Sequence, residues 1–488
     1  MRSQSEEDPA SPWWVLKFGG TSVSSRQAWE HIDDAIREHR SRGRRVLVVC
    51  SAVRGITNLL ESALETVGAG GSAAAQLASL RATHVALGDE LDLDAAALLS
   101  RELRSLDRLL APGSTLTPAR RARVLAHGEL MSTRLGTAWL ARRDQPVRRI
   151  DARALLRAQP VDETIGPVAE VDRYLSAQVD SRPNPRLRLP TPVVVTQGFL
   201  ARGQGGGTVL LGRGGSDTSA ACLAAVIGAE ALEIWTDVPG MFSADPRTVD
   251  GARLIRAVSY AEAETMGALG AKVLHPRSVR PVRERGIPLW IRWTHRPKLG
   301  GTVVHAESIE GAKAITSRGG LGLLTMCRPS QWQPVGFMAE VAECFRRTGV
   351  SMDLISSSPS EIRATIDLAA LPGADAAIGA LLADLERVCA PTLMRDLACV
   401  SIIGDGVAHR LATQAAEVLA LSSHDVHLVV HAANDTHVSW VVDAAHADEV
   451  VATAHDALFT QVSESYLGAA WSELVDVPNR ITTRAASA

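Results

Sequence analysis

A chain of 488 residues is long enough for two to four domains, each with its own hydrophobic core. Its 46% hydrophobic and 22% charged residues are ordinary for a globular protein, and its net charge of −3 gives no reason to expect nucleic acid or membrane as a partner. No apolar run reaches the roughly 18–20 residues of a spanning helix, and residues 1–12 are polar, as in a disordered tail. The six cysteines lack CxxC spacing, so we expect reduced thiols and a cytoplasmic protein.

Apolar runs and helical patterns alternate over the first 300 residues. The runs expected as buried parallel strands are Val15–Phe18, Arg45–Ser51, Pro192–Gln197 and Ala231–Trp235. The helical patterns are Ser25–Arg40, several helices within residues 72–142, and Ser216–Gly228. Because strands and helices alternate, we predict an α/β fold with a mainly parallel central sheet sandwiched by helices.

The composition changes near Arg296–Gly301, which we predict as a domain boundary. Beyond it, two successive stretches of about 70 residues each follow the order of a βαββαβ unit and form an internal repeat. The elements predicted for the first copy are Leu321–Met326, Gly336–Arg346, Val350–Ile355, Arg363–Asp367 and Ala374–Val388. Those predicted for the second copy are Cys399–Ile403, Arg410–Leu421, His427–Val430, Val438–Val442 and Ala447–Leu458.

Lysine is rare in this chain, because only four of the 51 Lys and Arg residues are lysines. Two of the four lie in segments that have the composition of site loops, Lys17 in VLKFGGTSV and Lys272 in GAKVLHPR. A compact ammonium can bridge phosphate oxygens from several angles, whereas a guanidinium is a wide planar fork. This bias indicates phosphate chemistry near both lysines.

The segment that contains Lys17 follows a predicted strand and precedes a predicted helix. Gly19 and Gly20 let the backbone come close to a phosphate, and the helix N-terminus offers free N–H donors. The segment lacks the GxxxxGK[ST] pattern of a Walker loop. The alternative is a tight strand-to-helix turn with a solvent-exposed lysine.

A second glycine loop, GRGGSDTS at residues 212–219, also opens a predicted helix. Arg213 can hold a carboxylate with two parallel hydrogen bonds, and Ser216 with the loop amides can hold an anion. Asp217 can orient an ammonium group. The alternative is a capped helix start, which leaves an arginine between two glycines unexplained.

Two further segments are ambiguous by themselves. TDVPG at 236–240, with Asp245-Pro246-Arg247 soon after, fits either a Pro-Gly turn or a nucleotide pocket at the carboxyl end of a strand. Glu129 is a lone carboxylate in a helical pattern, and a solvated helix face is the better interpretation of it taken alone.

Taken together, the motifs closely resemble those of the aspartate kinases, the aspartokinases of the amino-acid-kinase family. The matching segments of the first 300 residues are KFGGTSV at 17–23, SAVRGITNLL at 51–60, GELMS at 128–132, TVLLGRGGSD at 208–217, TDVPGMFSADPR at 236–247 and AKVLHPR at 271–277. Beyond them, KAITSRGGLGLLTM, GFMAEV and VSMDLISSS also match, so the resemblance covers roughly residues 13–460. The two C-terminal repeats resemble ACT domains, which bind an amino-acid effector in this family.

The resemblance implies a set of site residues. The residues implied around aspartate, with Arg213 on its α-carboxylate and Glu129 on its ammonium, are Ser51, Thr57, Glu129, Arg213, Gly214, Gly215 and Ser216. The residues implied around ATP are Lys17, Gly19, Gly20, Thr236, Asp237, Phe242, Arg247, Lys272 and Val273. The catalytic pair is Lys17 and Asp217, and ATP with Mg²⁺ is the expected cofactor set, without assigned metal ligands. The implied effector contacts are Gly336, Phe337, Ser351, Met352, Asp353 and Ser358.

Three positions depart from the family pattern. Phe242 stands where a tyrosine is usual, Trp293 where an asparagine is usual, and Pro359 where a glutamate is frequent. The first change loses a hydroxyl near the adenine, and the third leaves the identity of the effector open.

The resemblance also implies domain boundaries. The expected segments are a tail at 1–12, a kinase domain at 13–298, a linker at 299–316, ACT-like units at 317–392 and 393–465, and a tail or linker to a second enzyme at 466–488.

The expected activity is transfer of the ATP γ-phosphoryl to the β-carboxylate of L-aspartate, with lysine or threonine as effector and a homodimer or larger homo-oligomer as assembly. Two alternatives stay open, namely a kinase of another amino-acid carboxylate and a catalytically silent amino-acid sensor.

Overall fold

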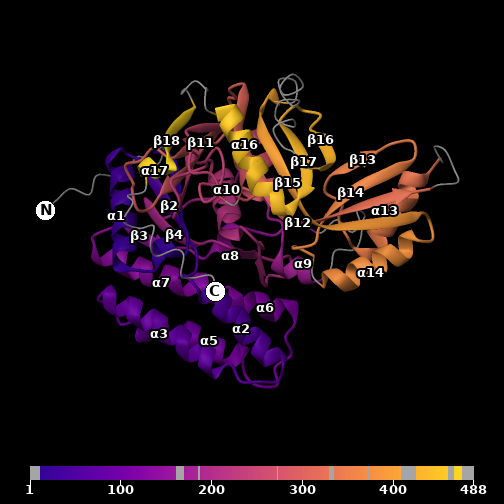
Figure 1. Ribbon diagram of the computed structural model, residues 1–488. Coiled ribbons are helices and arrows are strands. Elements are labelled where there is room, and N and C mark those ends of the chain that lie inside the picture. Colours follow the sequence, from indigo (N-terminus) through magenta and orange to yellow (C-terminus); the bar gives the residue numbers. More distant parts are fainter. Residues whose placement is uncertain are drawn as a thin grey trace. The chain divides into compact units, whose positions relative to one another are not determined.

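The computed structural model describes residues 11–160, 170–184, 187–271, 273–328, 335–371, 373–407, 425–459 and 466–474. The chain forms two compact units, which Figure 1 colours along the sequence. Unit 1 comprises Met1–Met241 and Val273–Glu307, and unit 2 comprises Phe242–Lys272 and Ser308–Ala488. Within the described ranges, no helix combines the length and apolar character needed to cross a membrane.

Unit 1 contains a mainly parallel sheet with the strand order β3-β4-β2-β1-β7-β10-β11. Its strands are β1 (Trp13–Phe18), β2 (Arg45–Cys50), β3 (Val147–Arg149), β4 (Val193–Gln197), β7 (Ala231–Thr236), β10 (Leu289–Trp293) and β11 (Thr302–His305), and the hairpin strands β5 (Leu200–Arg202) and β6 (Thr208–Leu210) lie apart from it. All neighbouring pairs from β3 to β10 are parallel, and β10 with β11 is antiparallel. The predicted α/β fold is confirmed.

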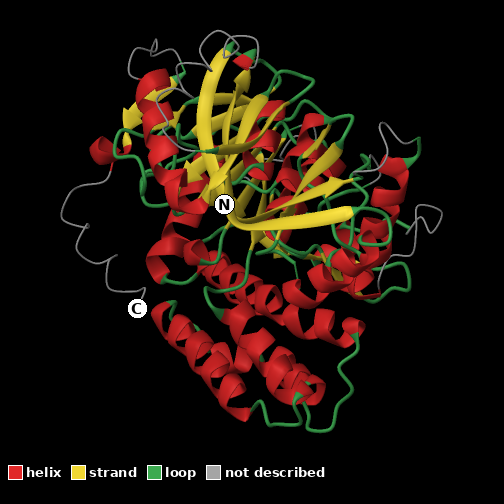
Figure 2. Ribbon diagram, turned by 45° about the vertical axis from the view of Figure 1, so that its right-hand side comes forward, coloured by secondary structure: helices red, strands yellow, loops and turns green. Residues whose placement is uncertain are grey.

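The helices of unit 1 follow the predicted order. They are η1 (Thr21–Val23), α1 (Arg26–Ser41), α2 (Ile56–Gly68), α3 (Ala74–Glu90), α4 (Ala95–Leu98), α5 (Ser100–Leu109), α6 (Pro118–Leu125), α7 (His127–Arg142), α8 (Ala152–Leu155), α9 (Glu170–Leu175), α10 (Gly215–Ile227) and α12 (Pro276–Arg283). Figure 2 shows α2, α3, α5, α6 and α7 as a helical layer beside the strands.

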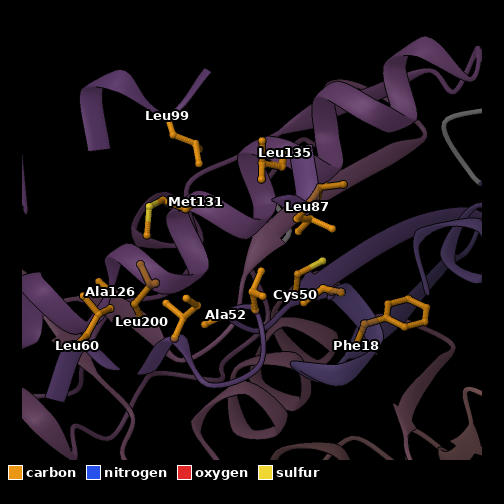
Figure 3. Close-up of a cluster of buried hydrophobic side chains, with 14 of the residues drawn as sticks. Phe18, Cys50, Ala52, Leu60, Leu87, Leu99, Ala126, Met131, Leu135 and Leu200 are labelled. Atoms are coloured by element: carbon orange, nitrogen blue, oxygen red, sulfur yellow. The ribbon is translucent and has the colours of Figure 1, made fainter. Parts of the chain in front are cut away.

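Both faces of the unit 1 sheet are buried, and side-chain alternation assigns the two faces. Leu16 and Phe18 of β1 belong to the large core beneath α1 and α7, which Figure 3 shows with Cys50, Met131 and Leu135. Successive side chains of a strand point to opposite faces, so Lys17 lies on the other face of the sheet, where α10 packs against β1.

One close helix contact organises the core face. Trp29 of α1 lies directly against Gly136 of α7, where an added Cβ would be 1.7 Å from the indole. Trp29 is fully buried, and its indole N–H donates to the carbonyl of Val23 at 3.1 Å. This contact fixes α7, and therefore the residues at its N-terminus, relative to the β1 loop.

Unit 2 is built on an antiparallel sheet with the order β13-β14-β12-β15-β17-β16. Its strands, including three short ones outside this sheet, are β8 (Arg253–Ile255), β9 (Ala257–Ser259), β12 (Gly311–Cys327), β13 (Ile355–Ser357), β14 (Glu361–Asp367), β15 (Ala390–Asp405), β16 (Val426–His431), β17 (His437–Asp443) and β18 (Leu467–Ala470). Its helices are α11 (Tyr260–Ala268), α13 (Phe337–Thr348), α14 (Ala374–Leu385), η3 (Ala444–His446), α16 (Ala447–Phe459) and α17 (Trp471–Leu474). The predicted pair of α+β units is confirmed, although the predicted helix Arg410–Leu421 lies outside the described residues.

Two long strands run through both halves of this sheet. Residues 321–327 of β12 pair with 390–397 of β15, and with β13, β14, α13 and α14 they form lobe 1. Residues 311–318 of β12 pair with 399–405 of β15, and with β16, β17 and α16 they form lobe 2. The register shifts between the two parts of β12, at Arg318/Leu321.

The predicted strand Val350–Ile355 is wrong for most of its length. β13 begins only at Ile355, and residues 350–354 form an irregular exit from α13 after Gly349. Thr365 of β14 binds this segment through its side chain, which accepts from the N–H of Leu354 at 2.9 Å. Asp353 and Leu354 also exchange two backbone hydrogen bonds of 2.9 Å with Thr365, but the regular strand pairing begins only at Ile355.

Residues near both ends of unit 2 add to its core. Tyr466 donates to the carbonyl of Ala312 at 2.9 Å, and the strand β18 pairs with β8, so residues 466–474 of the predicted tail or linker are ordered. Lys313 is fully buried, with its ammonium 3.5 Å from Glu262 and over the Tyr466 ring. The ammonium also donates to the carbonyls of Ile309 and Gly311.

Candidate active site

The carboxyl ends of three adjacent parallel strands meet at one place in unit 1. Ser22, after β1, lies 2.8 Å from Thr294, which follows β10. Thr294 in turn donates to the carbonyl of Thr236, at the end of β7, through its N–H at 2.9 Å and its hydroxyl at 3.0 Å. Open α/β sheets bind ligands at such ends. Thr236 and Asp237, predicted around ATP, belong to this group.

The two glycine loops meet at an ion pair. The ammonium of Lys17 lies 2.6 Å from the carboxylate of Asp217, in the first turn of α10. Both side chains are largely buried, with 10% and 17% exposure. A lysine that is solvent-exposed, the alternative interpretation of this segment, is therefore excluded. Gly19 and Gly20 follow after Phe18, and a Cβ added to Gly19 would lie 3.7 Å from the ammonium of Lys17, so the backbone beside the ammonium carries no side chain there.

The loop before α10 requires glycine at two successive positions. Gly214 has φ +67°, and an added Cβ would lie 2.5 Å from the side chain of His275. A Cβ on Gly215 would lie 2.6 Å from the ring of Phe199, itself held at φ +70°. Non-glycine residues rarely adopt such a φ, and strained residues cluster at functional sites. Phe199 and His275 are therefore two site neighbours that the sequence interpretation missed.

His275 carries an available sequence signal, because it lies in the same AKVLHPR segment as Lys272. Its side chain caps α12 by accepting from the N–H of Arg277 at 3.2 Å. Burial, followed by the charges of Arg277 and Arg213, lowers the pKa of His275, although the charge of Asp217 opposes this. The lowered pKa favours the neutral imidazole of His275. Phe199 offers no such signal, since a positive φ is not readable from a Gly-Phe pair.

Glu129 is buried, which corrects the expectation of a solvated helix face. It lies in the first turn of α7 with 3% exposure. One carboxylate oxygen accepts from the N–H of Ala52 at 3.2 Å, and the other, Oε2, is buried without a hydrogen-bond partner among the described residues. Burial raises the pKa of Glu129 to about 8, against smaller opposing effects of backbone hydrogen bonds.

The carboxylate oxygen of Glu129 that lacks a partner in the described part of the chain suits a cationic group of a ligand. Unpaired buried charges are costly, and proteins keep them mainly where a ligand completes them. The surroundings of Glu129 include Ser51, whose carbonyl accepts from Ser132 at 2.7 Å, and the start of α2, where Thr57 is half-buried. Three of the residues predicted around aspartate, Ser51, Thr57 and Glu129, therefore belong to adjoining segments.

The remaining predicted residues of the kinase site are distributed differently. Arg213 is exposed at the top of its loop, and Ser216 packs against Gly198. Val273 is half-buried in unit 1, and Lys272 lies outside the described residues. Phe242 and Arg247 belong to unit 2, where Phe242 is buried in an edge-to-face contact with Trp471 and Arg247 forms paired hydrogen bonds with Asp245.

The predicted effector residues all belong to lobe 1. Gly336 caps α13 with φ +88°, and Phe337 is the first residue of that helix. Ser351, Met352 and Asp353 form the irregular exit from α13, and Asp353 pairs with Arg318 at 2.6 Å. Ser358 closes the turn between β13 and β14 by accepting from the N–H of Glu361 at 3.2 Å.

No group of three or more His, Cys, Asp or Glu side chains with metal-binding geometry occurs among the residues that the structure describes. Mg²⁺ commonly binds through one or two carboxylates together with substrate phosphates. The donor set near Lys17 fits that arrangement, because Asp217 and Asp237 are the carboxylates of this edge.

These features define a class of protein. A parallel sheet whose strand ends carry a lysine–aspartate pair, a glycine loop with an arginine, and an orphaned carboxylate suits phosphoryl transfer to a small charged metabolite, because that reaction is catalysed mainly by positioning and charge neutralisation.

Comparisons with known proteins agree with this class. The sequence profile of the amino acid kinase family matches residues 12–292. Lysine-sensitive aspartokinase 3 of Escherichia coli is 32% identical over 91% of this chain and 99% of its own length. Chloroplastic aspartokinase 1 of Arabidopsis thaliana is 28% identical over 91% of this chain and 80% of its length. The chain therefore belongs to the amino acid kinase family, and within it to the aspartokinases.

Solved structures extend the similarity to the fold. The crystal structure of E. coli aspartokinase III in complex with aspartate and ADP matches with TM-score 0.77 and 31% identity, over 91% of this chain and 99% of that one. The same enzyme in complex with lysine and aspartate matches with TM-score 0.71 over the same shares. The predicted enzyme class, an ATP-dependent phosphotransferase, is confirmed.

Proposed function

We propose that this protein is an aspartate kinase, which transfers the γ-phosphoryl of ATP to the β-carboxylate of L-aspartate and gives L-aspartyl-4-phosphate and ADP. The observation that carries the proposal is the buried Oε2 of Glu129, which lacks a partner among the described residues and suits the ammonium of a free amino acid. E. coli aspartokinase III, a relative with 31% identity, was crystallised with aspartate and ADP.

In the proposed reaction, an oxygen of the β-carboxylate attacks the γ-phosphorus while the bond to the ADP oxygen breaks. The nucleophile is already ionised near neutral pH, so no strong base is needed. Lys17 would lie along the β- and γ-phosphates, held by Asp217, and neutralise the charge that develops on the leaving oxygen. Arg213 would hold the α-carboxylate with two hydrogen bonds, and Glu129 the ammonium. Mg²⁺ would enter with ATP and neutralise phosphate charge.

The proposed domain organisation is a kinase domain at 13–298, a linker at 299–316 and ACT-like units at 317–392 and 393–465, in a homodimer or larger homo-oligomer. Lysine or threonine is the proposed effector, bound at Gly336, Phe337, Ser351, Met352, Asp353 and Ser358. The lysine-sensitive relative and its complex with lysine support this proposal. The reaction is proposed as the first step towards lysine, threonine and methionine.

A kinase assay coupled to ADP release tests the activity. We expect turnover with L-aspartate and ATP, little or none with L-glutamate, and inhibition by lysine or threonine. Turnover with glutamate but not aspartate would replace the substrate, and a folded protein without turnover would favour the silent sensor. Calorimetry tests the effector separately, because absence of heat with both amino acids at millimolar concentration would remove the regulatory part alone.

A further inference from the structure

A polar cavity lies in unit 1, and none of the residues predicted to contact aspartate or ATP lines it. It has a volume of about 230 Å³ and is lined by α5, α6, α7, the end of β3, α8 and β6. Its charged lining residues are Arg101, Arg123, Arg134, Arg149, Arg153, Glu102 and Asp151. Five guanidinium groups against two carboxylates leave an excess of three positive charges. The lining residue His127 adds no charge in its neutral form, which burial favours by lowering its pKa.

Each of the two carboxylates of this cavity forms an ion pair with an arginine. Glu102 is 8% exposed and pairs through Oε1 with Arg134 at 2.7 Å, while its Oε2 is buried without a hydrogen-bond partner among the described residues. Asp151 forms two hydrogen bonds with Arg153, at 2.6 and 2.8 Å, and these lower its pKa even though burial alone would raise it. Arg153 also donates to Thr208 at 2.8 Å. The carboxylates therefore hold two arginines in place, and their charges offset only part of the burial and charge repulsion that lower the pKa of Arg149.

Arg149 is the most informative member of the cluster. It is half-buried at the end of β3, and burial, followed by the nearby charge of Arg134, lowers its pKa. Nε of Arg134 is buried without a hydrogen-bond partner among the described residues. Guanidinium groups brought together at such a cost indicate an anion that completes them.

The cavity lies on the other side of the helix that carries Glu129. At about 100° per residue, His127 and Arg134 of α7 point well away from Glu129. The arginine cavity is therefore distinct from the predicted substrate site. Its volume of about 230 Å³ lies below the roughly 300–1,000 Å³ of pockets for drug-sized ligands, which suits a small anion.

We propose that this cavity binds a small multivalent anion, a phosphorylated or polycarboxylate metabolite, held by Arg149, Arg123 and Arg134. Planar guanidinium forks bind phosphate and carboxylate oxygens in pairs, and Ser105 and Thr208 add hydroxyls to the wall.

Calorimetric titration with pyrophosphate tests the proposal, at fixed ionic strength because exposed charges are screened by salt. Saturating MgADP keeps pyrophosphate from the proposed nucleotide site. We expect one equivalent to bind, with Kd weakened at least about tenfold by Arg149→Gln, as expected for loss of a charge-assisted hydrogen bond. Arg123→Gln, at an exposed position, is expected to weaken binding severalfold while leaving the circular dichroism spectrum unchanged.

Arg104→Gln is the matched control, because Arg104 lies on the same helix as Arg101 but does not line the cavity. Citrate in the same titration identifies the source of the anion, since tighter binding of citrate with the same variant pattern assigns a polycarboxylate. Equal affinity in the wild type and both cavity variants, or no binding of either anion at millimolar concentration, overturns the proposal. Neither result affects the outcome of the kinase assay, so the proposed function is tested independently of the anion site.

Discussion

Replacing Glu129 by glutamine should make the protein more stable and a poorer enzyme, in a pH-dependent way. The folded-state pKa of about 8, against 4.5 for an ordinary glutamate, means that folding takes up a proton between these two values. Wild-type stability therefore falls as pH rises from 4.5 to 8, by about 1.4 kcal/mol per pH unit. A neutral glutamine has no such cost.

The shift of 8 − 4.5 = 3.5 units corresponds to about 5 kcal/mol above pH 8 and about 3 kcal/mol at pH 7. We expect Glu129→Gln to unfold at higher urea concentration than the wild type by amounts that approach these values, with no difference at pH 4. Glu61→Gln, which changes an exposed carboxylate on α2, is the control and should differ by less than about 0.5 kcal/mol at every pH. A stability difference that does not change with pH would refute the assignment of a buried, protonated Glu129.

The same residue should control substrate affinity. The ammonium of aspartate needs ionised Glu129, so the KM for aspartate should fall by up to about tenfold per pH unit between pH 6 and 8 and level off above. Glu129→Gln should raise KM roughly 10–100-fold through loss of a charge-assisted hydrogen bond, and its KM should lack the pH dependence. An unchanged KM in this variant would remove Glu129 from the substrate site.

Three further substitutions test other parts of the molecule. Lys17→Arg should lose about 100-fold or more in kcat, because a planar fork cannot replace a point charge, and near-normal turnover would contradict this role. Lys313→Met leaves a buried carboxylate uncompensated and should cost about 3–5 kcal/mol in urea unfolding, whereas Lys298→Met, at an exposed position, should cost almost nothing. Gly214→Ala should raise the KM for aspartate and cost about 1–3 kcal/mol, more than Gly228→Ala, which shares a positive φ but meets no neighbour within 4 Å.

The sequence predicts the sheet of unit 1 well because its strands are continuous apolar runs. Val193–Gln197, for example, is buried at every position, so its pattern and its environment agree. β12 was predicted only from Leu321 to Met326, although the strand begins at Gly311. Residues 311–320 carry a buried lysine and three glycines, for which local propensity predicts a loop. They form a strand because they pair with β15.

For the candidate site, sequence motifs supplied residue identities, and the structure supplied their environments. The burial of Glu129 cannot be read from a helical pattern, because it depends on the packing of α7 against segments more than 70 residues away, such as Ala52 at |i−j| = 77. The ion pair of Lys17 with Asp217 joins loops that are 200 residues apart in the sequence. Only the family resemblance predicted that these two residues lie close together. The arginine cavity has no motif at all, since its lining comes from separate helices and strand ends.

The two strands that pass through both lobes have a practical consequence for dissecting this protein. A fragment that starts at residue 317 would lack the first part of β12, which pairs with the last part of β15. In the whole chain Ile315 lies opposite Ile402, and Ala314 lies opposite Ile403. An unpaired strand edge promotes aggregation, so this fragment should precipitate. A fragment that starts at residue 309 keeps β15 paired with β12 and should stay in solution. The two lobes share the continuous strands β12 and β15, so we expect a change in strand twist in one lobe to affect the other.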